Sequence, residues 1–393
     1  MIRLPPGHAP AMALAGLLVA AGCGVRVPPP PGPVEAPRVV MGDHGPAPDA
    51  QWGWKPPPPP AGEAPDPILH SPWARDPEIR REVEAWMDRF TVREGAWFAA
   101  YLARMGRYAP LVDSTLAVRD LPSSLRYLPI VESGYHPGAV SRASAAGLWQ
   151  FMAPVARGFG MRVDAVVDER RDPVRATPAA LQFLDELHQR FGSWFLALAA
   201  YNGGPSRVDA LLRQYAPLSP PGDSLYLVIR PHLPRETREF IPKFLAASTL
   251  ASHPEAYGLA APELLSPLAY DVVTVPDATT LDVVAAAAGV PEAEVLELNP
   301  QILRGVTPRG RATELRVPAG RGEAFAAAYA LVPPNERVTV TEHVVAKGET
   351  LSEIAQQYGI RTAELQAANP RVQPRRMRVG TRLLVPLVPR RGS

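Results

Sequence analysis

Apolar residues recur at the spacing of a helix face through much of the chain. Asp76 suits an N-cap and Pro77 a first helical position, so we expect a helix to begin there. Its inward face carries Val83, Trp86, Met87 and Phe90. A second helix is expected over residues 94–105, with a connection at residues 116–121. Aromatic residues at these spacings are typical of a core, so we assign them to packing.

The clearest helical patterns lie between residues 177 and 204. One helix is expected to start at Thr177 and to stop at Gly192, with leucines along one face. Residues 194–201 are almost wholly apolar, which predicts a buried central helix that ends at Asn202. Residues 147–159 are also expected to be helical. Up to about residue 262 the chain should therefore form a mainly α-helical domain.

After residue 262 the pattern changes to short strands and short helices. Residues 343–386 predict the order strand, helix, helix, strand, with a capping box at Thr350 that opens the first helix. Residues 270–318 repeat this order but lack the turn around Gly348. We therefore expect two small α+β modules of βααβ type, the first of them degenerate, joined by a short helix within residues 321–341.

The first seventy residues show neither the apolar spacing of a helix nor the alternation of a strand. Residues 11–21 form an apolar run that is too short to span a bilayer but suits the core of a signal peptide. The chain is then rich in proline to about residue 67, which favours extended polyproline II spacers. We predict a signal peptide at residues 1–22 and a proline-rich tether at 23–70. Trp52 and Trp54, inside this tether, either dock on the helical domain or have no role.

Composition limits the class of function. The chain has 393 residues and a formal net charge of +2, so charge gives no argument for a nucleic-acid or polyanion partner. One cysteine, Cys23, cannot form an intramolecular disulfide. The eight histidines show no metal-ligand spacing, so we expect neither a metal nor a cofactor.

Glu132 is the candidate for chemistry. It is a lone carboxylate between the apolar residues 128–131 and a break at Ser133-Gly134. In an apolar groove such a group stays protonated, because desolvation disfavours its charged form, and a protonated acid suits glycosidic cleavage. Hydrolases of this kind usually need a second carboxylate. The loop residues Asp164, Asp168 and Asp172 have no assignable position, and we interpret the charge cluster at 168–173 as structural.

Four short motifs follow one another in order. ESG around Glu132 is followed by GLWQFM (147–152), ALAAYNGG (197–204) and LPRETREFIPKF (233–244), and then by a LysM-like segment. This order resembles the membrane-bound lytic murein transglycosylase D family, whose catalytic domain is of the soluble-lytic-transglycosylase type with a goose-lysozyme-like fold. The resemblance implies a catalytic domain at residues 71–262, a degenerate LysM-like module at 263–320, a linker at 321–341 and a LysM domain at 342–388.

The resemblance also implies a reaction. In that family one glutamate protonates the β-1,4 bond between N-acetylmuramic acid and N-acetylglucosamine, then takes a proton from the muramoyl C6 hydroxyl to close a 1,6-anhydro ring. Carried onto this chain, the acid and base is Glu132, and Tyr201 orients or stabilises the reacting centre. Substrate contacts fall on Ser141, Gln150, Met152, Asn202 and Glu236. Ser133 joins this set, either bonding Glu132 or capping its helix.

Two attachment sites follow from the same resemblance. LysM modules grip the N-acetyl groups of glycans in a groove, here formed by Gly348, Glu349, Thr350, Leu351, Asn369 and Pro370. LVAAGC resembles a bacterial lipobox, in which Cys23 becomes the lipidated first residue, although an ordinary signal peptide with an incidental cysteine is the alternative. Gly24 in place of Asp favours the outer membrane. We expect a lipid-anchored protein of the bacterial cell envelope, on the periplasmic face of that membrane.

Two other classes of function stay open. A non-catalytic peptidoglycan-binding scaffold would use the same groove, but it would be free to lose Glu132. A lysozyme-like hydrolase would need a second carboxylate or a positioned water. Peptidoglycan glycan strands are the expected partner in each case, and the sequence does not indicate an oligomeric state.

Overall fold

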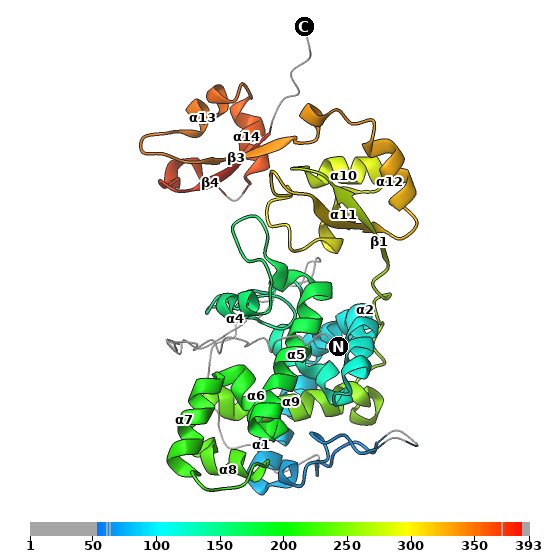
Figure 1. Ribbon diagram of the computed structural model, residues 1–393, viewed down its shortest axis with the longest axis vertical. Coiled ribbons are helices and arrows are strands. Elements are labelled where there is room, and N and C mark those ends of the chain that lie inside the picture. Colours follow the sequence, from blue (N-terminus) through cyan, green and yellow to red (C-terminus); the bar gives the residue numbers. More distant parts are fainter. Residues whose placement is uncertain (1–52, 60–61, 63, 371, 387–393) are drawn as a thin grey trace, which may run out of the picture.

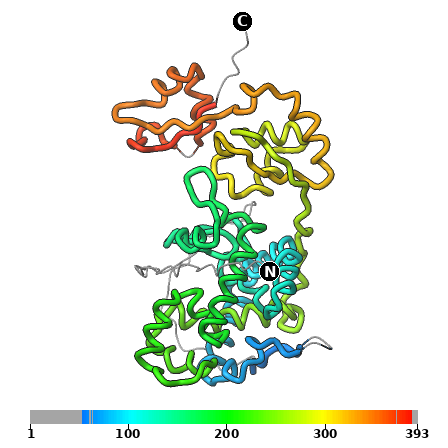
Figure 2. The backbone as a smooth tube through the Cα atoms, viewed as in Figure 1, coloured from blue at the N-terminus to red at the C-terminus, as the bar shows by residue number. Residues whose placement is uncertain are grey.

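The computed structural model describes residues 53–59, 62, 64–370 and 372–386. The predicted signal peptide, Cys23 and Trp52 lie outside the described residues. A helical domain is followed by two modules, each with one two-stranded antiparallel sheet (Figure 1). The backbone trace places both modules at one end of the helical domain (Figure 2). The predicted mainly α fold with two βααβ modules is confirmed.

The helical domain consists of nine α-helices and several single turns, counted over the described residues. The α-helices are α1 (Pro77–Asp88), α2 (Gly95–Arg119), α3 (Leu128–Ser133), α4 (Ala153–Gly158), α5 (Pro173–Phe191), α6 (Trp194–Gly203), α7 (Pro205–Tyr215), α8 (Ser224–Ile229) and α9 (Arg235–Ser252). The turns are Pro72–Arg75, Arg89–Arg93, Ser123–Tyr127, Glu169–Arg171, Arg230–His232 and Pro254–Tyr257.

Three helix boundaries differ from the prediction. α2 continues from Gly95 to Arg119, through the segments expected to end at 105 and to connect at 116–121. α5 begins at Pro173, earlier than expected, because Asp172 caps it by accepting the N–H of Val174 at 2.9 Å. The helix expected over 147–159 is wrong for its first half. Gly147 and Gln150 have φ angles of 85° and 48°, which a right-handed helix cannot contain.

The core of the helical domain surrounds α6, as its apolar sequence predicts. All of Trp194–Ala200 is buried, between α5 on one side and α9 on the other. α1 packs along α9. Trp54 also docks on this pair: its indole is 3% exposed, its backbone N–H donates to Glu84 at 2.8 Å and its Nε1–H to Thr249 at 3.0 Å. Packing therefore begins before residue 71, within the segment predicted as tether.

Each module has its own apolar core. In the first, β1 (Tyr270–Val275) pairs with β2 (Thr313–Pro318) around α10 (Leu281–Ala288) and α11 (Glu292–Leu298), and α12 (Gly322–Tyr329) packs on α10. In the second, β3 (Val340–Val344) pairs with β4 (Arg382–Pro386) around α13 (Leu351–Gln357) and α14 (Thr362–Ala368). Single turns at Pro334–Glu336 and Pro374–Arg376 complete them. Among the described residues no helix has the length and apolarity needed to cross a lipid bilayer.

Candidate active site

Glu132 lies in the last turn of the short helix α3. Pro129 stands in the first turn of this helix, and the chain leaves the helix at Gly134 with a left-handed φ of 59°. A Cβ at Gly134 would come within 2.5 Å of the Tyr101 ring. Only glycine therefore allows the chain to turn sharply and pass this ring directly after Glu132. Arg104 holds the turn by donating its Nε–H to the Gly134 carbonyl at 2.8 Å.

The Glu132 carboxyl group is held protonated at neutral pH. Burial raises its pKa from an ordinary value of 4.5 to about 8; nearby Lys243 lowers this pKa and Glu236 raises it. Desolvation is the largest of these effects, so burial of the carboxyl group sets its protonation state. The sequence-based expectation of a protonated acid agrees with this direction.

Lys243 of α9 is the cation beside this acid. Its ammonium donates to the carbonyl of Val131 at 2.9 Å and lies 5.5 Å from the centre of the Trp86 ring. Burial lowers its pKa, while Glu132 raises it. Sequence reasoning missed Lys243. The signal was present, because Lys243 follows Glu236 by seven residues and residues seven apart share one helix face.

The loop of residues 141–152 is bonded to α3 and to α6 and forms a wall that carries three of the predicted contact residues, Ser141, Gln150 and Met152. The backbone N–H and the hydroxyl of Ser141 close it against Ala145, at 2.9 and 3.0 Å. Gly147 approaches the next segment so closely that a Cβ there would lie 1.7 Å from the Arg170 carbonyl oxygen. Met152 ends the loop as N-cap of α4 and is partly buried.

Gln150 presents an acceptor in this wall. Its side-chain Nε2 donates to the Gly147 carbonyl at 2.8 Å, which orients the amide. Its Oε1 is buried and has no hydrogen-bond partner among the residues that the structure describes. A buried amide oxygen left unpaired is costly, so this atom is suited to accept a hydrogen bond from a bound hydroxyl or N–H group.

Tyr201 and Asn202 emerge at the end of α6, as predicted. Tyr201 donates its hydroxyl to the Trp149 carbonyl at 2.7 Å, and its pKa is raised by burial and by Glu132. The side chains of Tyr201 and Glu132 are therefore close enough for the charge of one to act on the other. The amide oxygen of Asn202 accepts from the hydroxyl of Thr237 at 2.9 Å, which joins α6 to α9.

Ser133 and Glu236 differ in their exposure. Ser133 is 1% exposed and donates its hydroxyl to the Leu148 carbonyl at 2.8 Å, so it joins α3 to the 141–152 loop from within the protein. Glu236 lies in the first turn of α9 with its side chain exposed. It is the carboxylate that raises the pKa of Glu132.

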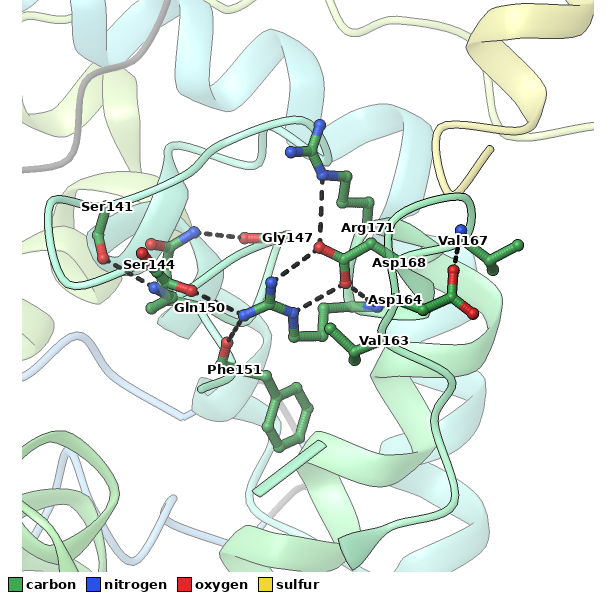
Figure 3. A network of polar contacts seen from close by, with 12 residues as sticks. Ser141, Ser144, Gly147, Gln150, Phe151, Val163, Asp164, Val167, Asp168 and Arg171 are labelled. Carbon is green, nitrogen blue, oxygen red and sulfur yellow. Dashed lines mark hydrogen bonds and ion pairs between the residues drawn. The ribbon is translucent and has the colours of Figure 1, made fainter. Parts of the chain in front are cut away.

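The three loop aspartates have structural partners. Asp164 accepts the N–H groups of Val166 and Val167 at 2.7 and 2.8 Å. Asp168 forms a two-pronged ion pair with Arg170, at 2.8 Å for both contacts (Figure 3). Asp172 caps α5 and accepts from Arg316 of the first module at 2.9 Å. The interpretation of residues 168–173 as a structural cluster is supported by these bonds.

The predicted glycan contacts of the second module include both exposed residues, such as Gly348 and Thr350, and buried ones. Gly348 has φ 90°, and Glu349 accepts from His343 at 2.8 Å. The capping box at Thr350 is present, and Leu351 is 4% exposed. The Asn369 amide, before Pro370, donates to the Leu384 carbonyl at 2.7 Å and so holds β4. The described residues include no group of three or more His, Cys, Asp or Glu that could hold a metal ion.

Comparison with known families matches three segments of the chain. Residues 114–218 match the transglycosylase SLT domain, 269–333 the LysM-like domain of lytic transglycosylase MltD, and 343–386 the LysM domain. The chain therefore carries one segment similar to an SLT domain, followed by two segments similar to LysM-type domains. The SLT segment contains Glu132, Gln150 and Tyr201.

Curated relatives extend the likeness. The chain is 33% identical over 263 residues to "Membrane-bound lytic murein transglycosylase D" of Escherichia coli K12, and equally to that of strain O6:H1. The match covers 64% of this chain and 57% of each relative. Among solved structures, the 70 kDa soluble lytic transglycosylase of Escherichia coli aligns at 19% identity and a TM-score of 0.33, over 49% of this chain and 34% of that one.

Proposed function

We propose that the protein is a peptidoglycan lytic transglycosylase in which Glu132 is the only general acid and base. The observation that carries this proposal is a carboxyl group with a pKa of about 8, beside Tyr201, inside the segment that matches the SLT domain. The name of the curated relatives supports murein as the substrate. As proposed for this chain, the enzyme breaks the β-1,4 bond between N-acetylmuramic acid and N-acetylglucosamine.

The raised pKa suits both halves of the proposed reaction. With its proton in place at pH 7, Glu132 protonates the glycosidic oxygen as the bond to the muramoyl C1 breaks. The carboxylate that remains is more basic than an ordinary glutamate. It takes the proton of the C6 hydroxyl as that oxygen bonds to C1, which restores the acid and leaves a 1,6-anhydro product. Acid–base catalysis of this kind contributes roughly 10²–10⁴-fold.

Neighbouring groups support each step. The Lys243 ammonium stabilises the carboxylate between proton donation and proton recovery, because a cation close to an anion in a poorly solvated site acts strongly. Tyr201, fixed on the Trp149 carbonyl, packs one side of the reacting centre. Gln150 Oε1, Met152 and Asn202 then provide the sugar contacts, with Ser141 shaping their loop.

The positions of the acids favour this reaction over hydrolysis. Asp164, Asp168 and Asp172 are each engaged in caps or ion pairs, so none is placed as a second catalytic carboxylate. Glu236 is the one acid whose charge acts on Glu132, and it is therefore the residue on which a hydrolase alternative depends. Glu236→Gln is therefore included in the product analysis below.

The attachment sites complete the proposal. The second LysM-type module would hold glycan strands at residues 348–351 and 369–370, and Cys23 would carry a lipid that anchors the protein in the cell envelope, on the periplasmic face of the outer membrane. The match to a LysM domain and the name of the membrane-bound relatives support these assignments.

The test is product analysis on purified cell-wall sacculi. The full chain in mild detergent should release muropeptides that are one water lighter than hydrolysis products and have no reducing end, and Glu132→Gln should release none. Glu236→Gln should keep the same products. Reducing-end products that vanish with Glu236→Gln would establish a hydrolase instead. Tight sacculus binding without any product would establish the scaffold.

A further inference from the structure

The first module is joined to the helical domain through the loop that follows α11. We define the docking loop as residues 299–304 and the hairpin as residues 163–168 of the helical domain. Within the hairpin, Asp164 N–H donates to the Val167 carbonyl at 2.8 Å, and residues 163 and 168 form an antiparallel bridge. The hairpin therefore presents a tight turn that lies directly before the Asp168–Arg170 ion pair (Figure 3).

Docking is made by backbone pairing and by a shared apolar core. Asp168 N–H donates to the Gln301 carbonyl and Leu303 N–H to the Val166 carbonyl, both at 2.9 Å. Val167 and Ile302 form a bridge between these bonds, and each is only 5% exposed. Val167 belongs to the apolar cluster of the module and not to that of the helical domain. The hairpin thus completes the core of the module.

The internal repeat identifies what this loop is in the other module. Asn299 and Asn369 follow α11 and α14, and each side-chain amide donates four residues back along the chain and to the last strand of its module. Ile302 and Val372 then donate their N–H groups to the carbonyls of Asn299 and Asn369, both at 3.0 Å. The docking loop is therefore the counterpart of the segment that begins at Asn369, which includes two of the predicted glycan contacts, Asn369 and Pro370.

From the hairpin, contacts lead into the wall of the candidate active site. Arg170, fixed by Asp168, donates to the carbonyls of Ser144 and Phe151 at 2.7 and 3.0 Å, and so joins both ends of the segment that contains Gln150 (Figure 3). A second link runs from Arg316 of β2 to Asp172, the cap of α5. Both partners of that ion pair are nearly buried, with side chains 12% and 4% exposed.

We propose that the first module is an internal clamp: its docking loop binds the hairpin of the same chain in place of a glycan, and thereby holds the 141–152 loop in its binding conformation. Its LysM-like fold would supply one preformed surface, used for self-docking here and for glycan in the second module. The effect on sugar turnover rests on the proposed function, but the effect on loop order does not.

The experiment compares two matched variants of the full chain. Ile302→Asp places a carboxylate in the docked core, and Val372→Asp makes the same change at the repeat-equivalent position of the second module. Hydrogen–deuterium exchange is followed at the amides of residues 144–151 and of strands β1 and β2. Turnover is measured on soluble, peptide-free glycan oligosaccharides, and binding on intact sacculi.

Ile302→Asp should speed exchange of the 144–151 amides about tenfold and slow turnover of soluble oligosaccharides by a similar factor. Val372→Asp should leave the exchange of the 144–151 amides unchanged. Unaltered exchange at 144–151 in Ile302→Asp would overturn the clamp, including the case in which β1 and β2 lose protection, since the loop would then be ordered without the module. Weaker sacculus binding by Ile302→Asp with an ordered loop would instead make the module a glycan binder.

Arg316→Met tests the second link without placing a charge in the core. It should also speed exchange at residues 144–151, to a smaller extent, because the ion pair with Asp172 is the contact with the helical domain that it removes, whereas its contacts with Leu298 and Tyr270 lie within the module. Should the wild-type protein prove inactive on every glycan, the exchange results would still decide on the clamp, while the proposed function alone would fall.

Discussion

Replacing Glu132 by Gln should make the helical domain more stable at neutral pH. The folded state holds a proton with a pKa of about 8, whereas an unfolded glutamate has a pKa near 4.5. Below pH 4.5 the group is protonated in both states and does not affect the free energy of unfolding. As the pH rises from 4.5 toward 8, the unfolded state loses this proton first, so the free energy of unfolding falls progressively. At pH 7, which is 2.5 units above the pKa of the unfolded state, this loss amounts to about 3 kcal/mol at most. Glu132→Gln should restore it, because glutamine does not ionise.

The assay is unfolding followed by tryptophan fluorescence. All seven tryptophans precede residue 195, so the signal reports the helical domain and not the two modules. The variant should match the wild type at pH 4 and exceed it at pH 7, with a melting temperature roughly 5–10 °C higher. Glu186→Gln, on the exposed side of α5, is the control and should change little at either pH. A difference that does not grow between pH 4 and pH 7 would refute the assigned burial of Glu132.

Three further changes test other parts of the structure. Lys243→Met should move the alkaline limb of the pH–rate profile, which reports Glu132, to higher pH, and Glu236→Gln should move it to lower pH; shifts of the same sign would contradict their opposite charges. Gly147→Ala should cost about 4 kcal/mol or more in denaturant unfolding, because its Cβ would lie 1.7 Å from a carbonyl oxygen, and a loss under 1 kcal/mol would show that the loop can shift. Trp54→Ala should cost about 3–5 kcal/mol in the same assay, and an unchanged midpoint would mean that its docking adds nothing.

Local patterns were sufficient where a segment makes its own structure. The apolar run of α6, the N-cap of α1 and the capping box at Thr350 each depend on residues a few positions apart. The same rules failed at residues 147–152, whose apolar spacing imitates a helix. There the backbone is shaped by contact with Arg170, which lies 19 residues from Phe151 in the sequence, and periodicity carries no information about such contacts.

In the candidate site, too, the sequence indicated some of the residues but not the contacts that depend on packing. Motif order placed Glu132, Gln150, Tyr201 and Asn202 in one region, and the structure brings the ends of α3 and α6 together as that order required. The sequence places Lys243 on the same helix face as Glu236, but its contact with α3 depends on how α9 packs and does not follow from that spacing. The docking of the first module on the hairpin was equally hidden, since the hydrogen bonds between them are made mainly by backbone atoms, and residue type does not show which distant segments pair in this way.

The docked Trp54 has a mechanical consequence. Any pull on the chain before residue 53 enters the folded protein at Trp54, whose backbone N–H is bonded to Glu84 of α1 and whose indole N–H is bonded to Thr249 of α9. The load is then shared by two long helices packed side by side, rather than by the turn at residues 72–75. α9 is also the helix that carries Lys243, about a turn and a half before Thr249. If the protein is lipid-anchored as proposed, traction on the anchor would thus be felt first by the helix that holds the cation beside the acid.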